Sequence, residues 1–85
     1  MAAIEEVNEP IDVVTVFRDG GMCPVKFRWA GRTYPIARIA YRWVTREGAY
    51  GLHHFAVVAD GEEVYEIVLN SHDLKWQLAK VHMKG

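Results

Sequence analysis

The chain has 85 residues, of which 51% are hydrophobic and 25% charged, and its formal net charge is −1. This length makes one small domain, and the apolar content excludes a disordered polypeptide, because enough apolar surface is present to offset the entropy of the unfolded chain. The nearly neutral charge excludes a global field that would attract nucleic acid or an acidic membrane.

Cysteine content and hydropathy indicate the cellular compartment and the relation of the chain to membranes. Cys23 is the single cysteine, so no internal disulfide can form, and we expect a reducing, cytoplasmic compartment. No apolar stretch approaches the roughly 20 residues of a membrane-spanning helix, so we expect no membrane contact.

The first ten residues form an acidic segment. They contain Glu5, Glu6 and Glu9 without a basic residue, and they end at Pro10. Such a composition at a terminus predicts a flexible tail over residues 1–10. Residues 11–85 are then expected to form a single β-barrel-like domain.

Strand patterns recur along the rest of the chain, each with β-branched or alternating apolar residues bounded by turn residues. They cover residues 11–17, 25–29, 33–44, 50–59 and 62–69. The last segment, residues 74–83, is ambiguous, because Leu74, Leu78 and Val81 fit helical spacing while Trp76 and Leu78 fit a strand.

The apolar residues also predict how the strands pair, because residues opposite each other in a hairpin share a face of the sheet. A two-residue loop at Gly31-Arg32 and three-residue loops over residues 46–48 and 59–61 give the best match, the last with Gly61 in a left-handed conformation. The predicted opposite pairs are Trp29 with Tyr34, Phe27 with Ile36, Ile39 with Phe55, Phe55 with Tyr65, and His54 with Glu66.

This register requires a β-bulge near Ala37-Arg38, because the apolar positions change parity there. It directs Tyr41 and Trp43 into the core and leaves Arg28, Arg38 and Arg42 outward. It also turns valines outward, which favours a protein partner or a second copy of the chain. The outward positions are Val58, Val64 and Val68 or their neighbours.

Residues 20–46 carry basic residues and no acid. The candidate partner-binding residues of this block are Arg28, Arg32, Arg38, Arg42 and Arg46. One interpretation is a solvated face, with arginines approached by acids such as Glu63 or Glu66 on neighbouring strands. The other is a nucleic-acid interface, which needs aromatic rings on the same wet face as the arginines. The predicted register places those rings in the core, so the solvated face is favoured.

No group of residues predicts catalysis, a cofactor or a metal. His53 and His54 are neighbours on a strand and therefore point to opposite faces, and no second cysteine accompanies Cys23. Gly20-Gly21 lacks the helix and the Lys-Ser/Thr pair that follow the glycines of a phosphate-binding loop. We therefore predict a non-enzymatic protein.

The segment Trp29–Trp43 follows the pattern W-x-G-R-x-Y-x-[VI]-x-x-[VIL]-x-x-x-W. A later strand with Tyr65 and a closing strand with Trp76 and Leu78 accompany it. In these features the chain resembles a small bacterial family of compact all-β domains of unknown function. The resemblance implies a strand rather than a helix over residues 74–82, and it transfers no catalytic residue.

The combined expectation is an all-β domain of about six antiparallel strands that form a small, partly open barrel, with an SH3-like arrangement as one option. Its expected function is that of a protein-interaction or accessory module. The alternative is a nucleic-acid-binding module that uses an arginine-rich outer face.

Overall fold

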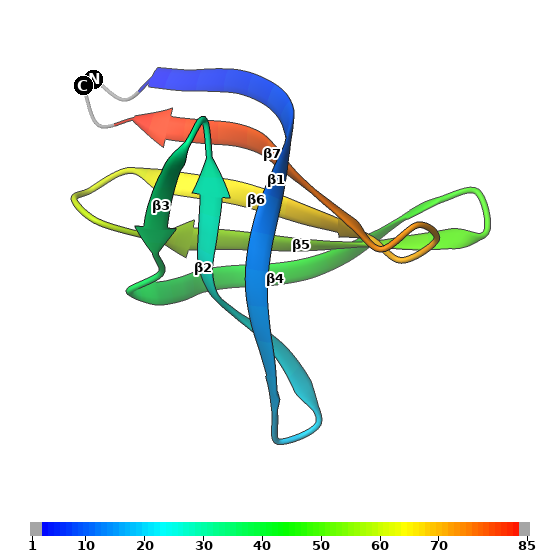
Figure 1. The fold of residues 1–85 in the computed structure, drawn as a ribbon. Coiled ribbons are helices and arrows are strands. Elements are labelled where there is room, and N and C mark those ends of the chain that lie inside the picture. Colours follow the sequence, from blue (N-terminus) through cyan, green and yellow to red (C-terminus); the bar gives the residue numbers. More distant parts are fainter. Residues whose placement is uncertain (1–2, 84–85) are drawn as a thin grey trace.

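The computed structural model describes residues 3–83, which form seven β-strands (Figure 1). Neighbouring strands are antiparallel, and the order across the sheet is β3-β2-β1-β7-β6-β5-β4. The strands are β1 (Ala3–Arg18), β2 (Gly21–Trp29), β3 (Arg32–Pro35), β4 (Arg38–Glu47), β5 (Tyr50–Val58), β6 (Val64–Asn70) and β7 (Lys75–Met83). The all-β prediction is confirmed, and the ambiguous last segment is a strand. The described residues contain no helix long and apolar enough to cross a membrane.

The sheet bends sharply along β1. The first part of this strand, Ala3–Ile11, pairs with β7, and the second part, from Asp12 onward, pairs with β2. Asn8, at φ 52°, and a shift in register between Glu6 and Glu9 mark the bend. As a result β2 and β3 pass over the face of β5 and β6, and one sheet supplies both layers of the core (Figure 1).

The prediction of a flexible acidic tail is wrong for the part of it that the structure describes. Residues 3–10 are strand residues paired with β7, and Glu6 lies opposite Lys80, which is a favourable cross-strand pair. Glu9 accepts a 2.7 Å hydrogen bond from the indole N–H of Trp29 on β2. Glu9 therefore makes a specific side-chain contact between β1 and β2. Residues 1 and 2 lie outside the described range.

The sheet does not close into a barrel within the described residues, because β3 and β4 stand at opposite ends of the strand order. The expected barrel of about six strands, and with it the SH3-like arrangement, is therefore replaced by an open, bent sheet of seven. The connection between β3 and β4 ties the layers together. There the Ile36 N–H donates to the Val25 carbonyl at 2.9 Å, and the Ala37 N–H donates to the Val58 carbonyl at 2.8 Å.

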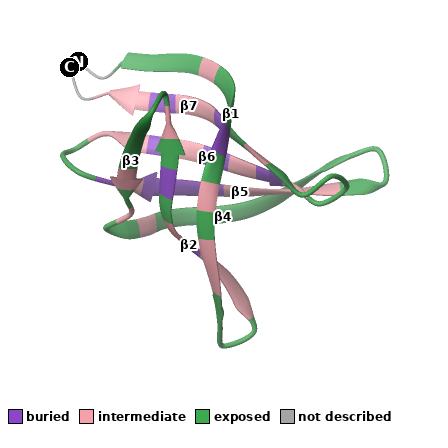
Figure 2. Cartoon of the chain, viewed as in Figure 1, coloured by how far each residue is buried: buried purple, intermediate pink, exposed green. Residues whose placement is uncertain are grey.

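The core lies between the two layers and is centred on aromatic rings. Phe27 on β2 is 1% exposed, and it stacks on Tyr34 with ring centres 4.9 Å apart. Tyr65 on β6 tilts against both rings, at 5.3 and 5.4 Å. Contacts of this kind each contribute about 0.5–1.5 kcal/mol beyond burial of their area. Figure 2 shows the buried residues gathered where the layers cross and the exposed ones along β4 and at the hairpin tips.

Two hairpins differ from the predicted register by two residues. Phe27 lies opposite Tyr34 rather than Ile36, across a turn in which Ala30 and Gly31 have positive φ. Phe55 lies opposite Ile67 rather than Tyr65. A shift of two preserves the face of every side chain, so the predicted core residues of these strands are correct. Gly61 has a φ of 90°, as predicted, while His54 lies opposite Val68 instead of Glu66.

The register of the β4–β5 hairpin differs from the predicted register by an odd number of residues, and this changes which side chains face the core. Its turn is Gly48-Ala49, with Glu47 opposite Tyr50 and Gly48 at φ 62°, and not the predicted loop over residues 46–48. The β-bulge lies between Ile39 and Tyr41 and not near Ala37-Arg38. An odd shift reverses the two faces of a strand. The predictions for Tyr41, Arg42 and Trp43 are therefore wrong: Tyr41 and Trp43 point outward, and Arg42 lies opposite Phe55 on the core side. Ile39 faces the core and Arg38 faces outward, as predicted.

The two phenylalanines at opposite extremes of burial test this account of the core. Phe27→Ala should lower the free energy of unfolding by about 3–5 kcal/mol, because it removes a buried ring that joins the layers. Phe17→Ala is the matched control: Phe17 is 78% exposed, and the change should alter stability by less than about 0.5 kcal/mol. Urea denaturation followed by tryptophan fluorescence measures both. Equal losses would contradict this assignment of the core.

Candidate functional site: an edge strand beside an apolar groove

β4 is a long edge strand whose side chains are largely exposed. Among the strands described it pairs with β5 alone, and every residue except Ile39 is exposed. Tyr41 is 75% and Val44 60% exposed. The register from Tyr41 to Glu47 contains no bulge. Along this part of β4, the backbone groups that point away from β5 are available to another strand.

The two faces of β4 differ in chemistry. Arg42, Val44 and Arg46 face the core side, since they lie opposite Phe55, His53 and Gly51. Tyr41, Trp43 and Thr45 face outward, since they lie opposite Ala56, His54 and Leu52. A strand added at this edge would therefore meet a basic and aliphatic face on one side and a mainly aromatic face on the other.

An apolar groove of about 370 Å³ opens beside the core-side face of β4. One wall comes from the β1–β2 hairpin, which projects beyond the crossing of the layers (Figure 1). The other wall comes from β4 and β5. The residues that line it are Phe17, Gly20, Met22, Arg42, Trp43, Val44, His53, His54 and Phe55. Most of this lining is apolar, so the groove suits a hydrophobic side chain.

Arg42 spans the groove from β4 to β2. Its Nη1 donates a hydrogen bond to the Met22 carbonyl at 3.1 Å, and its Nη2 lies 4.0 Å from the Cys23 sulfur. The guanidinium carbon is 5.6 Å from the centre of the Phe55 ring, which is within the range of a cation–π contact. Arg42 therefore links β4 to β2 through its side chain, although these two strands share no main-chain pairing. The Arg42 side chain is nevertheless exposed.

The structure does not bring the five candidate arginines onto one surface. Arg28 is exposed on β2 opposite Asp12, and Arg32 lies 5.4 Å from the ring centre of Tyr34. The other three belong to β4, with Arg38 on the outer face and Arg42 and Arg46 on the core side. All five side chains are exposed, which confirms the exposure predicted for Arg28, Arg38 and Arg42. The expected partner Glu66 instead contacts His82, with the Oε2 and Nε2 atoms 2.8 Å apart.

The outer face of the β4–β5 hairpin carries aromatic pairs that the sequence analysis missed. Trp43 stacks on His54 at 5.0 Å, and Tyr50 lies against His72 at 3.9 Å. The His54 Nε2 is 2.7 Å from the Thr45 hydroxyl oxygen. The signal that could have revealed this face is Gly48, since glycine at the first position of a two-residue turn is favoured in hairpins. The three valines predicted to be exposed, Val58, Val64 and Val68, are half-buried.

The environment of His54 favours its neutral form. Burial lowers the pKa of His54 below the value of 6.5 for a free side chain, and the nearby charge of His53 lowers the pKa further. Glu66 acts in the opposite direction and raises the pKa. The net direction is downward, which matches an imidazole covered by an indole ring.

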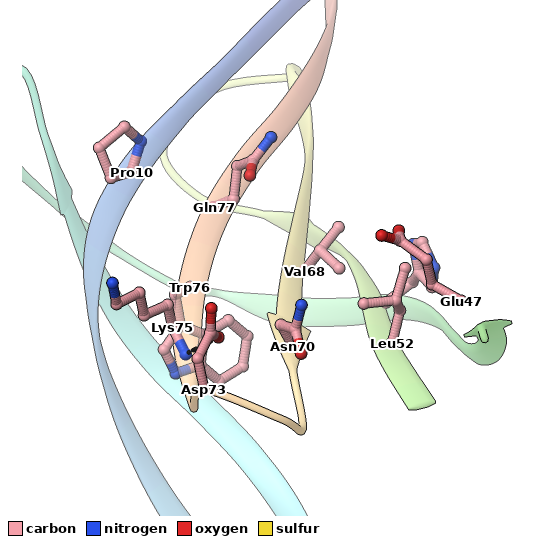
Figure 3. Close-up of a pocket in the computed structure, with 10 residues that line it drawn as sticks. Pro10, Glu47, Leu52, Val68, Asn70, Asp73, Lys75, Trp76 and Gln77 are labelled. Carbon is pink, nitrogen blue, oxygen red and sulfur yellow. Dashed lines mark hydrogen bonds between the residues drawn. The ribbon is translucent and has the colours of Figure 1, made fainter. Parts of the chain in front are cut away.

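A second cavity, of about 420 Å³, lies along β5, β6 and β7 (Figure 3). Two of its polar side chains, Asn70 and Asp73, accept hydrogen bonds from the main chain. Asn70 Oδ1 accepts from the His72 N–H at 2.8 Å, and Asp73 Oδ1 accepts from the Lys75 N–H at 3.0 Å. These groups stabilise the turn between β6 and β7, which accounts for their position without a ligand. Across residues 3–83 no three His, Cys, Asp or Glu side chains gather to hold a metal ion.

No protein-family model, curated protein or solved structure matches this chain. The resemblance of the segment Trp29–Trp43 to a bacterial family therefore stays a prediction.

The stack on His54 leads to a pH-dependent prediction. The unfolded chain protonates His54 near pH 6.5, and the folded chain does so at lower pH. Between these two pH values the unfolded state binds more protons, so stability should fall as the pH is lowered through this range. Trp43→Ala uncovers the ring and should raise the pKa of His54 towards 6.5.

The control is Tyr41→Ala, which removes an aromatic ring from the same face of β4 without uncovering His54. We expect it to leave the pKa of His54 unchanged. Two-dimensional NMR titration of the histidine ring protons measures the pKa in all three proteins. A wild-type pKa above 6.5 would contradict the assignment.

Proposed function

We propose that this chain is a non-enzymatic protein-interaction module that binds an extended segment of another protein along β4. The observation that carries the proposal is the position of a long, exposed edge strand directly beside an apolar groove. In recognition by strand addition, main-chain hydrogen bonds supply affinity and pockets for alternate side chains supply specificity. Here β4 offers the backbone groups, and the groove offers a pocket on the core side.

The length of the edge suits a short segment. The stretch Tyr41–Glu47, free of bulges, spans about 20–25 Å at the rise per residue of an antiparallel strand. A peptide of about seven residues would cover it. The contact would bury less surface than the roughly 1,600 Å² of a standard protein interface, so we expect reversible, transient binding.

The charges of β4 favour a different protein over a second copy of this chain. In a two-fold symmetric antiparallel pair, facing residues must come from the same face of the strand. A pair centred on Arg42 would place Arg42 against itself, and a pair centred on Val44 would place Arg42 against Arg46. Like charges directly opposite each other destabilise a sheet. A pair centred on Trp43 avoids this, so the homodimer remains an outcome to test.

Nucleic-acid binding is the second candidate function. The observation in its favour is that Tyr41 and Trp43 are exposed on the outer face of β4, the same face as Arg38. Exposed aromatic rings next to a cation can stack on bases. Only one arginine shares that face of the strand, and Glu47 shares it as well, so the protein partner is the stronger proposal. The free Cys23 thiol is compatible with the proposed cytoplasmic setting.

Selection from a random peptide display library against the purified chain tests the proposal. We expect selected peptides to shift the amide NMR signals of Tyr41–Glu47 and to slow hydrogen exchange there, because an added strand engages free N–H groups. Val44→Lys should abolish this binding. Val14→Lys is the matched control, since Val14 is an exposed valine on β1, and it should leave binding intact.

Three results would count against strand addition to a partner protein. Peptides that perturb only other strands would place the site elsewhere. A chain that is already dimeric, with β4 protected from exchange, would identify a second copy as the partner. Binding of mixed-sequence single-stranded nucleic acid at the same edge, lost in Tyr41→Ala and weakened by salt, would favour the second candidate.

A further inference from the structure

We infer that the segment bound along β4 carries the pattern acidic–x–apolar–x–acidic. This inference rests on the proposed function and names the chemistry of the partner at that same site. The acidic and apolar side chains would lie on the face of the added strand that turns towards the groove.

The pattern follows from the order of side chains on the core-side face of β4. Arg42, Val44 and Arg46 lie there at intervals of two residues. Side chains of an added strand that share this face are also spaced by two, and each packs beside one residue of β4. An acid beside each arginine and an apolar residue beside the valine give the best pairs. The pattern reads the same in both directions, so it applies to parallel and antiparallel addition.

Arg42 is the stronger of the two acid-binding positions. Its Nη1 is engaged by the Met22 carbonyl, while among residues 3–83 its Nη2 has only the Cys23 sulfur at 4.0 Å, a weak acceptor. The surrounding wall of Phe17, Met22 and Phe55 is apolar. A carboxylate that entered here would find guanidinium donors beside apolar side chains. The bound segment itself would shield this pair from water, which strengthens charge-assisted hydrogen bonds.

Arg46 is the weaker position, because it lies opposite Gly51 close to the end of the β4–β5 hairpin, where it is exposed. An acid paired with it would remain in contact with water, so the interaction would be screened by salt. We therefore expect the acid beside Arg42 to account for most of the selectivity.

The central apolar position follows from exposed hydrophobic surface on both sides of the groove. Val44 is 60% exposed on β4, and Phe17 is 78% exposed on the β1–β2 hairpin. Both line the same groove. An aliphatic side chain between them would remove apolar surface from water on each wall, which is the main favourable contribution to such contacts.

The outer face of the added strand carries no comparable restriction. Its side chains would pack beside Tyr41, Trp43 and Thr45, which are uncharged. Aromatic and hydroxyl side chains accept β-branched or polar neighbours across a strand pair. The x positions of the pattern are therefore expected to tolerate valine and threonine alike.

Capped, fluorescently labelled nonapeptides test the inference. The test peptide is Thr-Val-Glu-Thr-Val-Thr-Glu-Val-Thr, in which the two acids and the central valine share one face. In the two comparison peptides both acids are replaced, by Gln in one and by Lys in the other. Fluorescence anisotropy should show that the Glu peptide binds at least about tenfold more tightly than the Lys peptide, with the Gln peptide between them. The difference should shrink as salt is added.

Protein variants locate the acid preference. Arg42→Gln should reduce the preference for Glu over Lys to less than about threefold, and Arg46→Gln should reduce it by a smaller factor. Arg46 is exposed near the hairpin end, so its variant stays informative if loss of the Arg42 contacts unfolds the chain. Arg28→Gln removes the same charge from β2, outside the groove, and should keep the full preference.

The outcomes separate this inference from the function on which it rests. Equal binding of the Glu and Lys peptides at β4, located by amide NMR shifts, would overturn the acidic pattern and leave strand addition standing. An acid preference that persists in both Arg42→Gln and Arg46→Gln would also overturn it. If none of the three peptides, nor any peptide from the display selection, perturbs β4, the proposed function fails.

Discussion

The pairing of β1 with two different strands is the constraint on which the rest of the structure depends. Because β1 leaves β7 near Ile11 and continues along β2, a single sheet folds over itself and encloses its own core. Phe27 on one layer meets Tyr65 on the other, and the hydrogen bonds of Ile36 and Ala37 join the layers at the β3–β4 connection. Loss of the bend would separate these contacts all at once.

The same geometry leaves the outer edge of β4 unpaired and so generates the candidate site. The β1–β2 hairpin runs across β4 and projects beyond it (Figure 1), but no described strand pairs with the outer edge of β4. Arg42 on β4 connects to β2 through its side chain, which donates a hydrogen bond to the Met22 carbonyl. An edge held open in this way can accept another strand, and three arginines with a bulge protect it against indiscriminate pairing.

The hairpins explain why sequence analysis located the core and missed the site. At Phe27–Tyr34 and Phe55–Ile67 the predicted registers were displaced by two residues, and an even displacement leaves every side chain on its face. At β4–β5 the displacement was odd, so Tyr41 and Trp43 were assigned to the core and Arg42 to the solvent side. The choice between a two-residue turn at Gly48-Ala49 and a three-residue loop depends on small differences in turn energy, yet it decides which face of the strand carries the groove.

By itself, the sequence determined the all-β class, the places of most turns and the core faces of β2, β5 and β6. These features follow from alternation and turn residues within a few positions of each other. Only the tertiary structure decided that residues 3–10 form part of β1, that the sheet stays open, and that Arg42 lies in a groove while Arg28 lies on another layer. Those features depend on which distant strands meet, and no local pattern specifies the partner of a strand that can pair on both of its edges.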